Sequence, residues 1–194
     1  IVLINKIGDY AIVGETLDDA AGEALDKSAK LLGLGYPGGP VLERLALKGD
    51  SSFLKLPSPL ADKKILDYSF SGLKTAFYYQ IKDWSKDKIN QNLNNLAASF
   101  QKAVFDTLIR KFTLAVEKYQ PKCLLLSGGV AANQNLRQRL RSLAKSQKLP
   151  LYLPFKKELN TDNAAMVGLA GLYQYQRQGS DDFENIDVNS QAEL

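Results

Sequence analysis

The sequence contains no histidine and a single cysteine, Cys123, among its 194 residues. Without histidine, no Ser–His–Asp triad, Cys–His dyad or histidine-ligated zinc site can be completed within this chain. A lone cysteine cannot form an internal disulfide, and no cationic start followed by an apolar core indicates a signal peptide. No apolar run approaches the roughly 20 residues of a membrane-spanning helix. We therefore expect a cytoplasmic protein with no membrane partner.

The remaining composition is that of a globular protein. Hydrophobic residues make up 45% and charged residues 24%, which excludes a wholly disordered chain, and the length predicts one domain or slightly more. The net charge of +4 is too small by itself to indicate a nucleic-acid partner. Its distribution is uneven, because residues 131–157 carry basic side chains and no acid, whereas residues after Ser180 carry acids and no Lys or Arg.

The order of predicted elements is typical of an α/β fold. Residues 1–13 indicate a hairpin around Gly8, and a chain that opens inside such a hairpin without Met is expected to be part of a longer protein. Thr16 and Asp19 resemble a capping box, so we expect a helix from there to Gly33, with Leu17 on its apolar stripe. Further helices are predicted over about 41–48, 72–84 and 93–119, after Asn133, and from a cap at 160–162 to about 178, with extended segments at 66–70, 123–126 and 150–154.

The strongest local motif is Ser127 to Asn133 (SGGVAAN), between a predicted buried strand and a helix. Gly128 and Gly129 would let the backbone approach a ligand closely, and a helix N-terminus presents free N–H groups to an anion. Asn133 is either a ligand for a base or ribose or simply the helix cap. Spacing alone leaves a ligand site and a packing role equally open.

Other candidates also have two interpretations. The glycines of Gly33 to Pro40 are either a helix end with a turn or a surface beneath a sugar or phosphate. Asp26 lies beyond the first helical turn on the polar face, where a carboxylate either meets solvent or binds a ribose. Asp162 is either an N-cap or a metal ligand that lacks partners here, and Lys74 is a turn residue or a phosphate contact.

Five stretches together resemble one family in order and spacing. They are Gly14 to Lys27, Tyr36 to Pro40, Tyr68 to Thr75, Ser127 to Asn133 and Thr161 to Met166. The family is the tRNA threonylcarbamoyladenosine transferase family TsaD, formerly called glycoprotease or O-sialoglycoprotein endopeptidase. The resemblance covers residues 1 to about 178.

The resemblance implies an actin-like (ASKHA, RNase-H-like) ATPase superfold. Residues 1–178 would form the C-terminal lobe, with a helical insertion at about 16–119 and a glycine-rich βα core at about 120–178. Residues 179–194 would be an acidic, disordered tail. An absent N-terminal lobe would carry the His-x-x-x-His metal motif, which would account for the lack of histidine, so these residues alone would be inactive.

The implied activity is transfer of a threonylcarbamoyl group from threonylcarbamoyl-AMP to the adenosine beside the anticodon of tRNAs that read codons beginning with A. The implied cofactors are one divalent metal, iron or zinc, and an adenylate ligand (threonylcarbamoyl-AMP, ATP or ADP). The implied partners are tRNA and TsaB-like and TsaE-like proteins. Asp162 resembles the metal ligand, and the nucleotide ligands correspond to Asp26, Gly39, Glu43, Gly128, Gly129 and Asn133.

Two other functions remain open at this point. An actin-fold kinase of small metabolites would share the Gly-Gly loop but not the Tyr36 to Pro40 or Tyr68 to Thr75 stretches. A noncatalytic paralogue would serve as an assembly partner, although retention of Asp26 and Asp162 argues against it.

The helix after Asn133 presents basic residues at spacings of three and four. Arg137, Arg141 and Lys145 fall on one face, and no acid interrupts the run. Such a face is either ordinary solvated surface or a set of phosphate contacts, which add affinity without sequence information. Because the implied substrate is a polyanion, we predict that these three residues bind tRNA.

Overall fold

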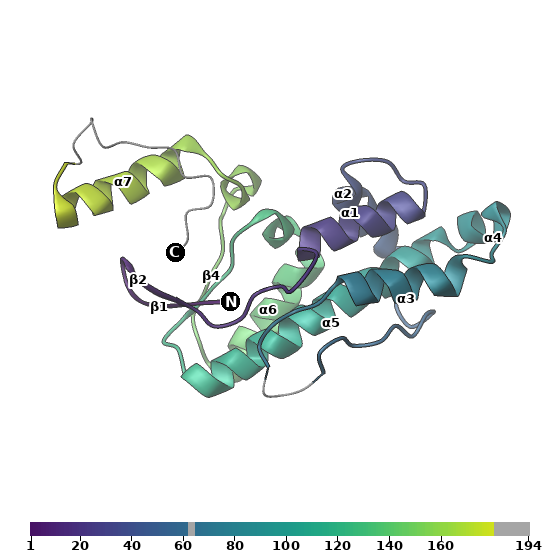
Figure 1. The fold of residues 1–194 in the computed structure, drawn as a ribbon, viewed down its shortest axis with the longest axis horizontal. Helices are drawn as coiled ribbons and strands as arrows, with labels where there is room; N and C mark the ends of the chain where they lie inside the picture. The colour runs from purple at the N-terminus through teal and green to yellow at the C-terminus, as the bar shows by residue number, and fades with distance from the viewer. Residues whose placement is uncertain (62–64, 181–194) are drawn as a thin grey trace.

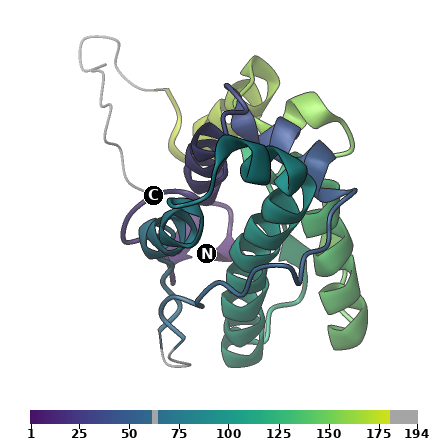
Figure 2. The ribbon, with the colours of Figure 1, turned by 90° about the vertical axis from the view of Figure 1, so that its right-hand side faces the viewer.

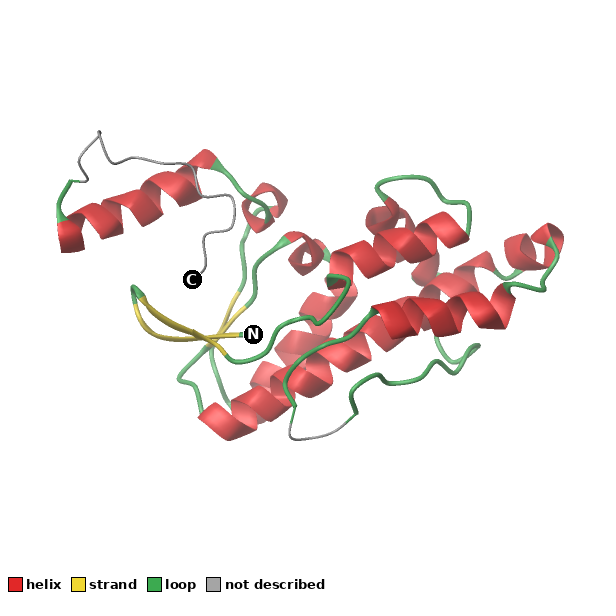
Figure 3. Cartoon of the chain, in the orientation of Figure 1, coloured by secondary structure: helices red, strands yellow, loops and turns green. Residues whose placement is uncertain are grey.

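A computed structural model describes residues 1–61 and 65–180, which form a mostly helical α/β structure (Figures 1 and 3). Its elements, in chain order, are β1 (Val2–Lys6), β2 (Asp9–Ile12), α1 (Ala21–Leu31), α2 (Gly38–Ala46), α3 (Ser71–Ile81), α4 (Lys86–Gln91), α5 (Leu93–Tyr119), β3 (Leu124–Leu125), the 3₁₀ helix η1 (Gly129–Ala132), α6 (Gln134–Gln147), β4 (Leu151–Tyr152), the 3₁₀ helix η2 (Lys157–Asn160) and α7 (Ala164–Gln178).

Two small sheets accompany the helices. Strands β1 and β2 pair antiparallel, with Val2 opposite Ile12, which confirms the predicted hairpin. Strands β3 and β4 pair in parallel, with Leu124 opposite Leu151, as expected for a strand–helix–strand unit whose connection contains α6. The predicted extended segment 66–70 makes only an isolated bridge between Tyr68 and Thr16.

Helix α5 is the centre of the helical core, as its apolar girth predicts. It runs through the length of the helical body, with α1, α2, α3 and α6 packed around it (Figures 1 and 2). Four phenylalanines from α5, α3 and the residue before α3 are almost fully buried, and the rings of Phe77 and Phe100 lie 4.9 Å apart. Burial of such rings is the largest contribution that single side chains make to this core. The four are Phe70, Phe77, Phe100 and Phe105.

Helix α1 begins at Ala21, five residues after the predicted start. The Thr16 hydroxyl donates to the Asp19 carbonyl oxygen (2.8 Å) within a turn, and Glu23 accepts a hydrogen bond from the Ala20 amide (3.4 Å). Leu17 therefore lies outside the helix and is 63% exposed, so its assignment to the apolar stripe is wrong. The physical reason lies about 50 residues away, because backbone amides at the start of α3 bind Asp18 and hold the turn.

Other helix boundaries also differ from the prediction. Helix α2 begins at Gly38 rather than near residue 41, so its glycines belong to the helix start. Helix α4 was not expected, and the Ser85 hydroxyl caps it by accepting from the Lys88 amide (3.2 Å). The cap of α7 is Asn163, one residue beyond the predicted range 160–162. Asp162 is thus not the helix cap.

Helix α7 packs little against the rest of the described structure. None of its described side chains is buried, and Figure 1 shows it apart from the body formed by α1 to α6. Its last turn reaches the β1–β2 hairpin, where the Arg177 guanidinium lies against Gly8. Most of the predicted acidic tail, from residue 181 onward, lies outside the described residues. Within residues 1–61 and 65–180, no helix has the length and apolarity required to cross a bilayer.

Candidate nucleotide-binding site

A carboxylate on α1 caps the glycine-rich start of α2. The Gly38 and Gly39 amides donate to Asp26 Oδ1 at 2.9 and 2.8 Å. A negative charge at a helix N-terminus is stabilised by the unpaired amides and the helix dipole. None of the contacts among the described residues uses Asp26 Oδ2, so that oxygen remains available to a ligand hydroxyl. The structure thus joins two predicted site residues, Asp26 and Gly39.

The two helices approach so closely that only glycine fits at one position. A Cβ atom on Gly38 would lie 2.3 Å from Ala29 Cβ, whereas a Cβ on Gly39 would meet only Asp26 Oδ1, at 3.6 Å. The first distance is far inside van der Waals contact and the second is ordinary. Gly38 therefore serves the packing of α1 on α2, and Gly39 leaves space beside the carboxylate.

Glu43 connects α2 to the start of α6. It lies one turn after Gly39 on α2, and its Oε1 accepts a hydrogen bond from the Gln134 amide at 2.8 Å. Because Gln134 is the first residue of α6, the carboxylate faces a second helix N-terminus. Glu43 and Gly39 therefore lie on the same side of α2, facing the region where the glycine-rich loop ends.

Asn133 is the N-cap of α6. Its Oδ1 accepts from the amides of Asn135 (2.9 Å) and Leu136 (3.2 Å), and its Nδ2 donates to Gln101 Oε1 (2.9 Å). The side chain is 7% exposed. The capping role is therefore present, and one N–H of the amide remains for a ligand.

The glycine-rich loop before Asn133 leaves open space. Gly128 has φ of +95°, a backbone conformation that favours glycine, and a Cβ on Gly128 or Gly129 would have no neighbour within 4 Å among the described residues. The following 3₁₀ helix lies on the start of α1, where a Cβ on Gly22 would be 3.2 Å from Val130 Cγ2. The loop, Asp26 and Glu43 are thus arranged around the N-terminal ends of α2 and α6.

Arg137 links three separate segments of the chain. Its Nε donates to the Ala131 carbonyl oxygen (2.5 Å), and its Nη2 donates to the Pro154 carbonyl oxygen and to Asn160 Oδ1, both at 3.1 Å. The rigid guanidinium fork suits several fixed acceptors. Arg137 is therefore half-buried beside the glycine-rich loop, whereas Arg141 and Lys145 are exposed.

Asp162 lies between η2 and α7 and is exposed. Among residues 1–61 and 65–180, no group of three or more His, Cys, Asp or Glu side chains is arranged to hold a metal ion. Tight metal sites collect several oxygen, nitrogen or sulfur ligands. The described residues therefore do not by themselves form the implied metal site.

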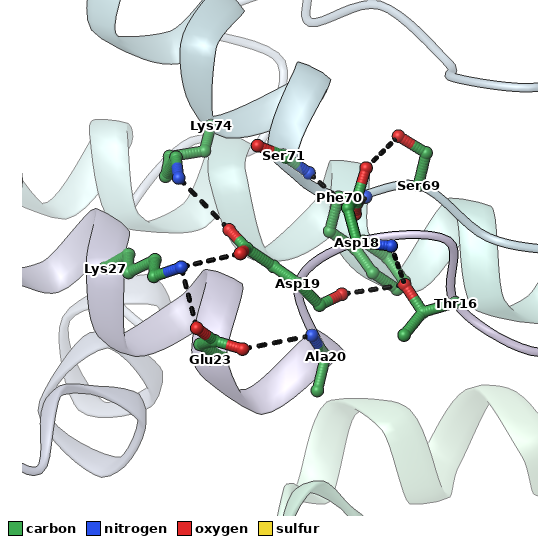
Figure 4. Close-up of polar contacts among 10 residues, drawn as sticks. All are labelled: Thr16, Asp18, Asp19, Ala20, Glu23, Lys27, Ser69, Phe70, Ser71 and Lys74. Carbon is green, nitrogen blue, oxygen red and sulfur yellow. Dashed lines mark hydrogen bonds and ion pairs between the residues drawn. The ribbon is translucent and has the colours of Figure 1, made fainter.

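A polar cluster links the turn before α1 to the start of α3 (Figure 4). Asp18 Oδ1 accepts from the Phe70 amide (2.7 Å) and the Ser71 amide (3.1 Å), and its Oδ2 accepts from the Ser69 hydroxyl (2.6 Å). Desolvation raises the pKa of Asp18, but these hydrogen bonds outweigh it, so the pKa lies below its ordinary value. Asp18 thus fixes the Tyr68 to Thr75 segment, a role that the sequence reasoning missed.

Asp19, the next residue, binds two lysines. Lys27 Nζ lies 2.6 Å from its Oδ1 and Lys74 Nζ lies 3.1 Å from its Oδ2. The hydrogen bond from Lys27 is the main reason why the pKa of Asp19 is lowered, and Lys74 adds to it. Glu23 also pairs with Lys27, at 2.7 Å (Figure 4). Lys74, considered above as a phosphate contact, is therefore already paired in this structure.

The profile of one protein family accounts for almost all of these segments. The profile described as "TsaD: tRNA N6-adenosine threonylcarbamoyltransferase" matches residues 1–169. The chain belongs to the TsaD family. The stretches Gly14 to Lys27 and Ser127 to Asn133, which the structure places against each other, both fall within the matched range.

Curated TsaD relatives match at similar levels. The tRNA N6-adenosine threonylcarbamoyltransferase of Thermosipho africanus is 42% identical over 94% of this chain and 54% of its own length. That of Herminiimonas arsenicoxydans is 46% identical over 89% and 50%, and that of Moorella thermoacetica is 45% identical over 94% and 52%. The chain therefore spans about half the length of the curated TsaD relatives it matches.

The match to TsaD confirms the family that five sequence stretches indicated. It does not test the roles of the individual site residues. The structure gathers Asp26, Gly39, Glu43 and the Gly128–Asn133 loop through direct hydrogen bonds and adjacent helix ends. Asp162 is not part of this hydrogen-bonded group, although Arg137 binds Asn160, two residues before it. Arg137 binds Ala131, Pro154 and Asn160. The only sequence signal for this role is a basic residue one turn after the helix cap.

Proposed function

We propose that this protein carries the adenylate-binding part of a tRNA threonylcarbamoyltransferase. The reaction moves a threonylcarbamoyl group from threonylcarbamoyl-AMP to N6 of the adenosine beside the anticodon, in tRNAs that read codons beginning with A. The observation that supports this proposal is the Asp26–Gly38–Gly39 contact, which lies beside an open glycine-rich loop in a chain of the TsaD family. Threonylcarbamoyl-AMP, ATP and ADP share the adenosine that such a site would bind.

The site residues would divide the recognition of the adenylate between them. Asp26 Oδ2 would accept a hydrogen bond from a ribose hydroxyl, while Oδ1 stays on the glycine amides. The remaining N–H of Asn133 would donate to the base or ribose, and the space beside Gly128 and Gly129 would admit the ligand close to the backbone.

The chemistry requires one bond to form and one to break. The adenosine amine attacks the carbamoyl carbon, the bond from that carbon to the phosphate oxygen breaks, and the amine loses a proton. The resemblance implies an iron or zinc ion with Asp162 among its ligands, which would polarise the carbonyl. Asp162 would supply one oxygen ligand, because the described residues form no group of three or more His, Cys, Asp or Glu side chains that could hold the ion by themselves.

The same proposal includes the architecture and the partners. Residues 1–178 would be an actin-like lobe, with the helical insertion at 16–119 and the βα core at 120–178. The tRNA, together with TsaB-like and TsaE-like proteins, would complete the assembly. The mainly helical arrangement around α5 and the parallel β3–β4 pair support an α/β lobe with a helical insertion.

A nucleoside assay tests the activity. The full-length protein that contains these residues, incubated with threonylcarbamoyl-AMP and unmodified tRNA, should yield threonylcarbamoyladenosine that mass spectrometry detects after digestion. Asp26→Asn keeps an oxygen for the glycine amides but loses the charge, so we expect adenylate affinity to fall by about 1–3 kcal/mol. Asp87→Asn, in the first turn of α4, is the control.

The alternative functions predict different results. A kinase of small metabolites would consume ATP with a metabolite acceptor and leave tRNA unmodified. A noncatalytic paralogue would bind its partner proteins without adenylate binding that depends on Asp26.

A further inference from the structure

A hollow opens between α1 and α3, away from the contacts that Asp26 makes. Its volume is about 620 Å³, and its walls include Lys27 and Lys30 from α1 and Lys74, Tyr78 and Tyr79 from α3. The nucleotide site described above uses none of these side chains. The hollow therefore needs an explanation of its own.

Two tyrosine rings stand exposed at this hollow. Tyr78 is 46% exposed and Tyr79 is 61% exposed, and their ring centroids lie 5.6 Å apart. Helix α3 packs into the core through Leu73, Phe77 and Ile81, so the tyrosines occupy its opposite side. Adjacent exposed aromatic rings of this kind provide a stacking surface for unpaired bases.

Positive charge surrounds the rings. Lys82 Nζ lies 5.2 Å from the centroid of the Tyr79 ring, and Lys30 is exposed on α1. Asp19 and Glu23 bind Lys27 and Lys74 and so keep those two ammonium groups at the rim of the hollow. Because Asp19 and Glu23 offset the charges of Lys27 and Lys74, the charges of this surface that can meet a polyanion are those of Lys30 and Lys82.

We propose that the α1–α3 hollow binds the single-stranded anticodon loop of the RNA substrate. Unstacked bases would lie on Tyr78 and Tyr79, and Lys30 and Lys82 would contact phosphates. Aromatic rings interleaved with lysines fit an RNA loop better than an RNA duplex, whose bases are stacked inside. The inference rests on the proposed function, and the position of Asp26 on α1 beside Lys27 would bring this RNA alongside the helix that holds the adenylate.

Fluorescence anisotropy with a labelled anticodon stem-loop tests the proposal on the purified protein. We expect Tyr79→Ala to weaken binding by about tenfold or more, and Tyr79→Phe, which keeps the ring, to stay within about twofold of the parent. The double variant Lys30→Gln/Lys82→Gln should reduce the slope of log affinity against log salt by about 0.7 per lysine. Lys122→Gln, an exposed lysine just beyond α5, is the matched control.

Two further measurements make the outcome decisive. Calorimetry with AMP should give the same affinity for all of these variants, since none touches the nucleotide site. In the modification assay, Tyr79→Ala should raise KM for tRNA and leave kcat unchanged. If Tyr79→Ala binds the stem-loop as the parent does, or if a blunt duplex of equal length binds equally well, the proposal is wrong. A full-length protein that binds the loop through Tyr79 but never modifies tRNA would instead refute the proposed function.

Discussion

Asp18 and Asp19 are neighbours in the sequence but stabilise different parts of the fold. Asp18 accepts hydrogen bonds from the start of α3, and Asp19 holds Lys27 and Lys74. The pKa of each carboxyl is lowered, so the unfolded state binds more protons than the folded state near these pKa values. The stabilisation is therefore present above about pH 4 and is lost as the pH falls through the folded-state pKa values.

The variant Asp18→Asn isolates one of these contributions. The amide oxygen still accepts from Phe70 and Ser71, but the charge at the helix start is lost, so we expect unfolding free energy at pH 7 to fall by roughly 0.3–1 kcal/mol. The difference from the parent should shrink as the pH falls through the lowered pKa of Asp18, because its carboxyl then becomes protonated. Urea unfolding at several pH values measures it, with the exposed Asp83→Asn as control. A difference that stays constant at every pH, down to the acid limit of the folded protein, would show that the charge is unimportant.

The roles of some single residues were predictable from their neighbours in the sequence, and the roles of others were not. Asn133 follows a glycine-rich turn and precedes an amphipathic helix, so its capping position was predictable from its neighbours. Asp18 and Arg137 were not predictable in this way. Their partners lie about 50 and up to 23 residues away, and only the tertiary fold brings them together.

At the scale of elements, two adjacent glycines at the contact between α1 and α2 have different expected roles, one in packing and one in the proposed ligand site. Gly38→Ala would place Cβ 2.3 Å from Ala29 Cβ, so we expect a loss of about 1–3 kcal/mol in stability as the helices shift. Gly39→Ala makes only an ordinary contact with Asp26 and should leave stability nearly unchanged, yet its methyl group should weaken AMP binding. Urea unfolding and calorimetry distinguish these effects. Parental AMP affinity in Gly39→Ala would remove Gly39 from the site.

Some helix boundaries were predictable from the sequence and others were not, for a physical reason. The apolar periodicity of residues 93–119 is strong and local, and α5 has those bounds. The start of α1 instead depends on Asp18, which binds an amide at the start of α3, and the start of α2 depends on Asp26 of α1, which binds the Gly38 amide. Capping by a distant side chain leaves no pattern in the helix that it caps. The long helix was therefore predictable, whereas these first turns were not.

At the scale of the whole molecule, the basic face of α6 is smaller than its sequence spacing indicates. Arg137 points to backbone acceptors around the glycine-rich loop, and Arg139 pairs with Asp106. Of the three residues predicted to bind tRNA, only Arg141 and Lys145 therefore present exposed positive charge.

We expect Arg141→Glu/Lys145→Glu to weaken tRNA binding and to reduce its salt dependence, by roughly 0.7–0.9 in slope for each phosphate that the protein no longer neutralises. AMP affinity should be unchanged. Arg137 is left intact, because its reversal would disturb the loop itself. Filter binding at low and moderate salt measures the effect, and Lys48→Glu serves as the control. Parental tRNA affinity and salt slope in the double variant would make this face ordinary surface.

The sparse packing of α7 has a consequence for local stability. Amide hydrogens in a helix exchange with solvent deuterium through local opening when few buried contacts oppose it. Because no described side chain of α7 is buried, its amides should exchange long before those of α5, whose opening requires loss of the core. Asp162 lies two residues before the start of α7, so its carboxylate is next to a helix for which we expect little protection. A ligand bound through Asp162 would therefore slow deuterium uptake across a whole helix.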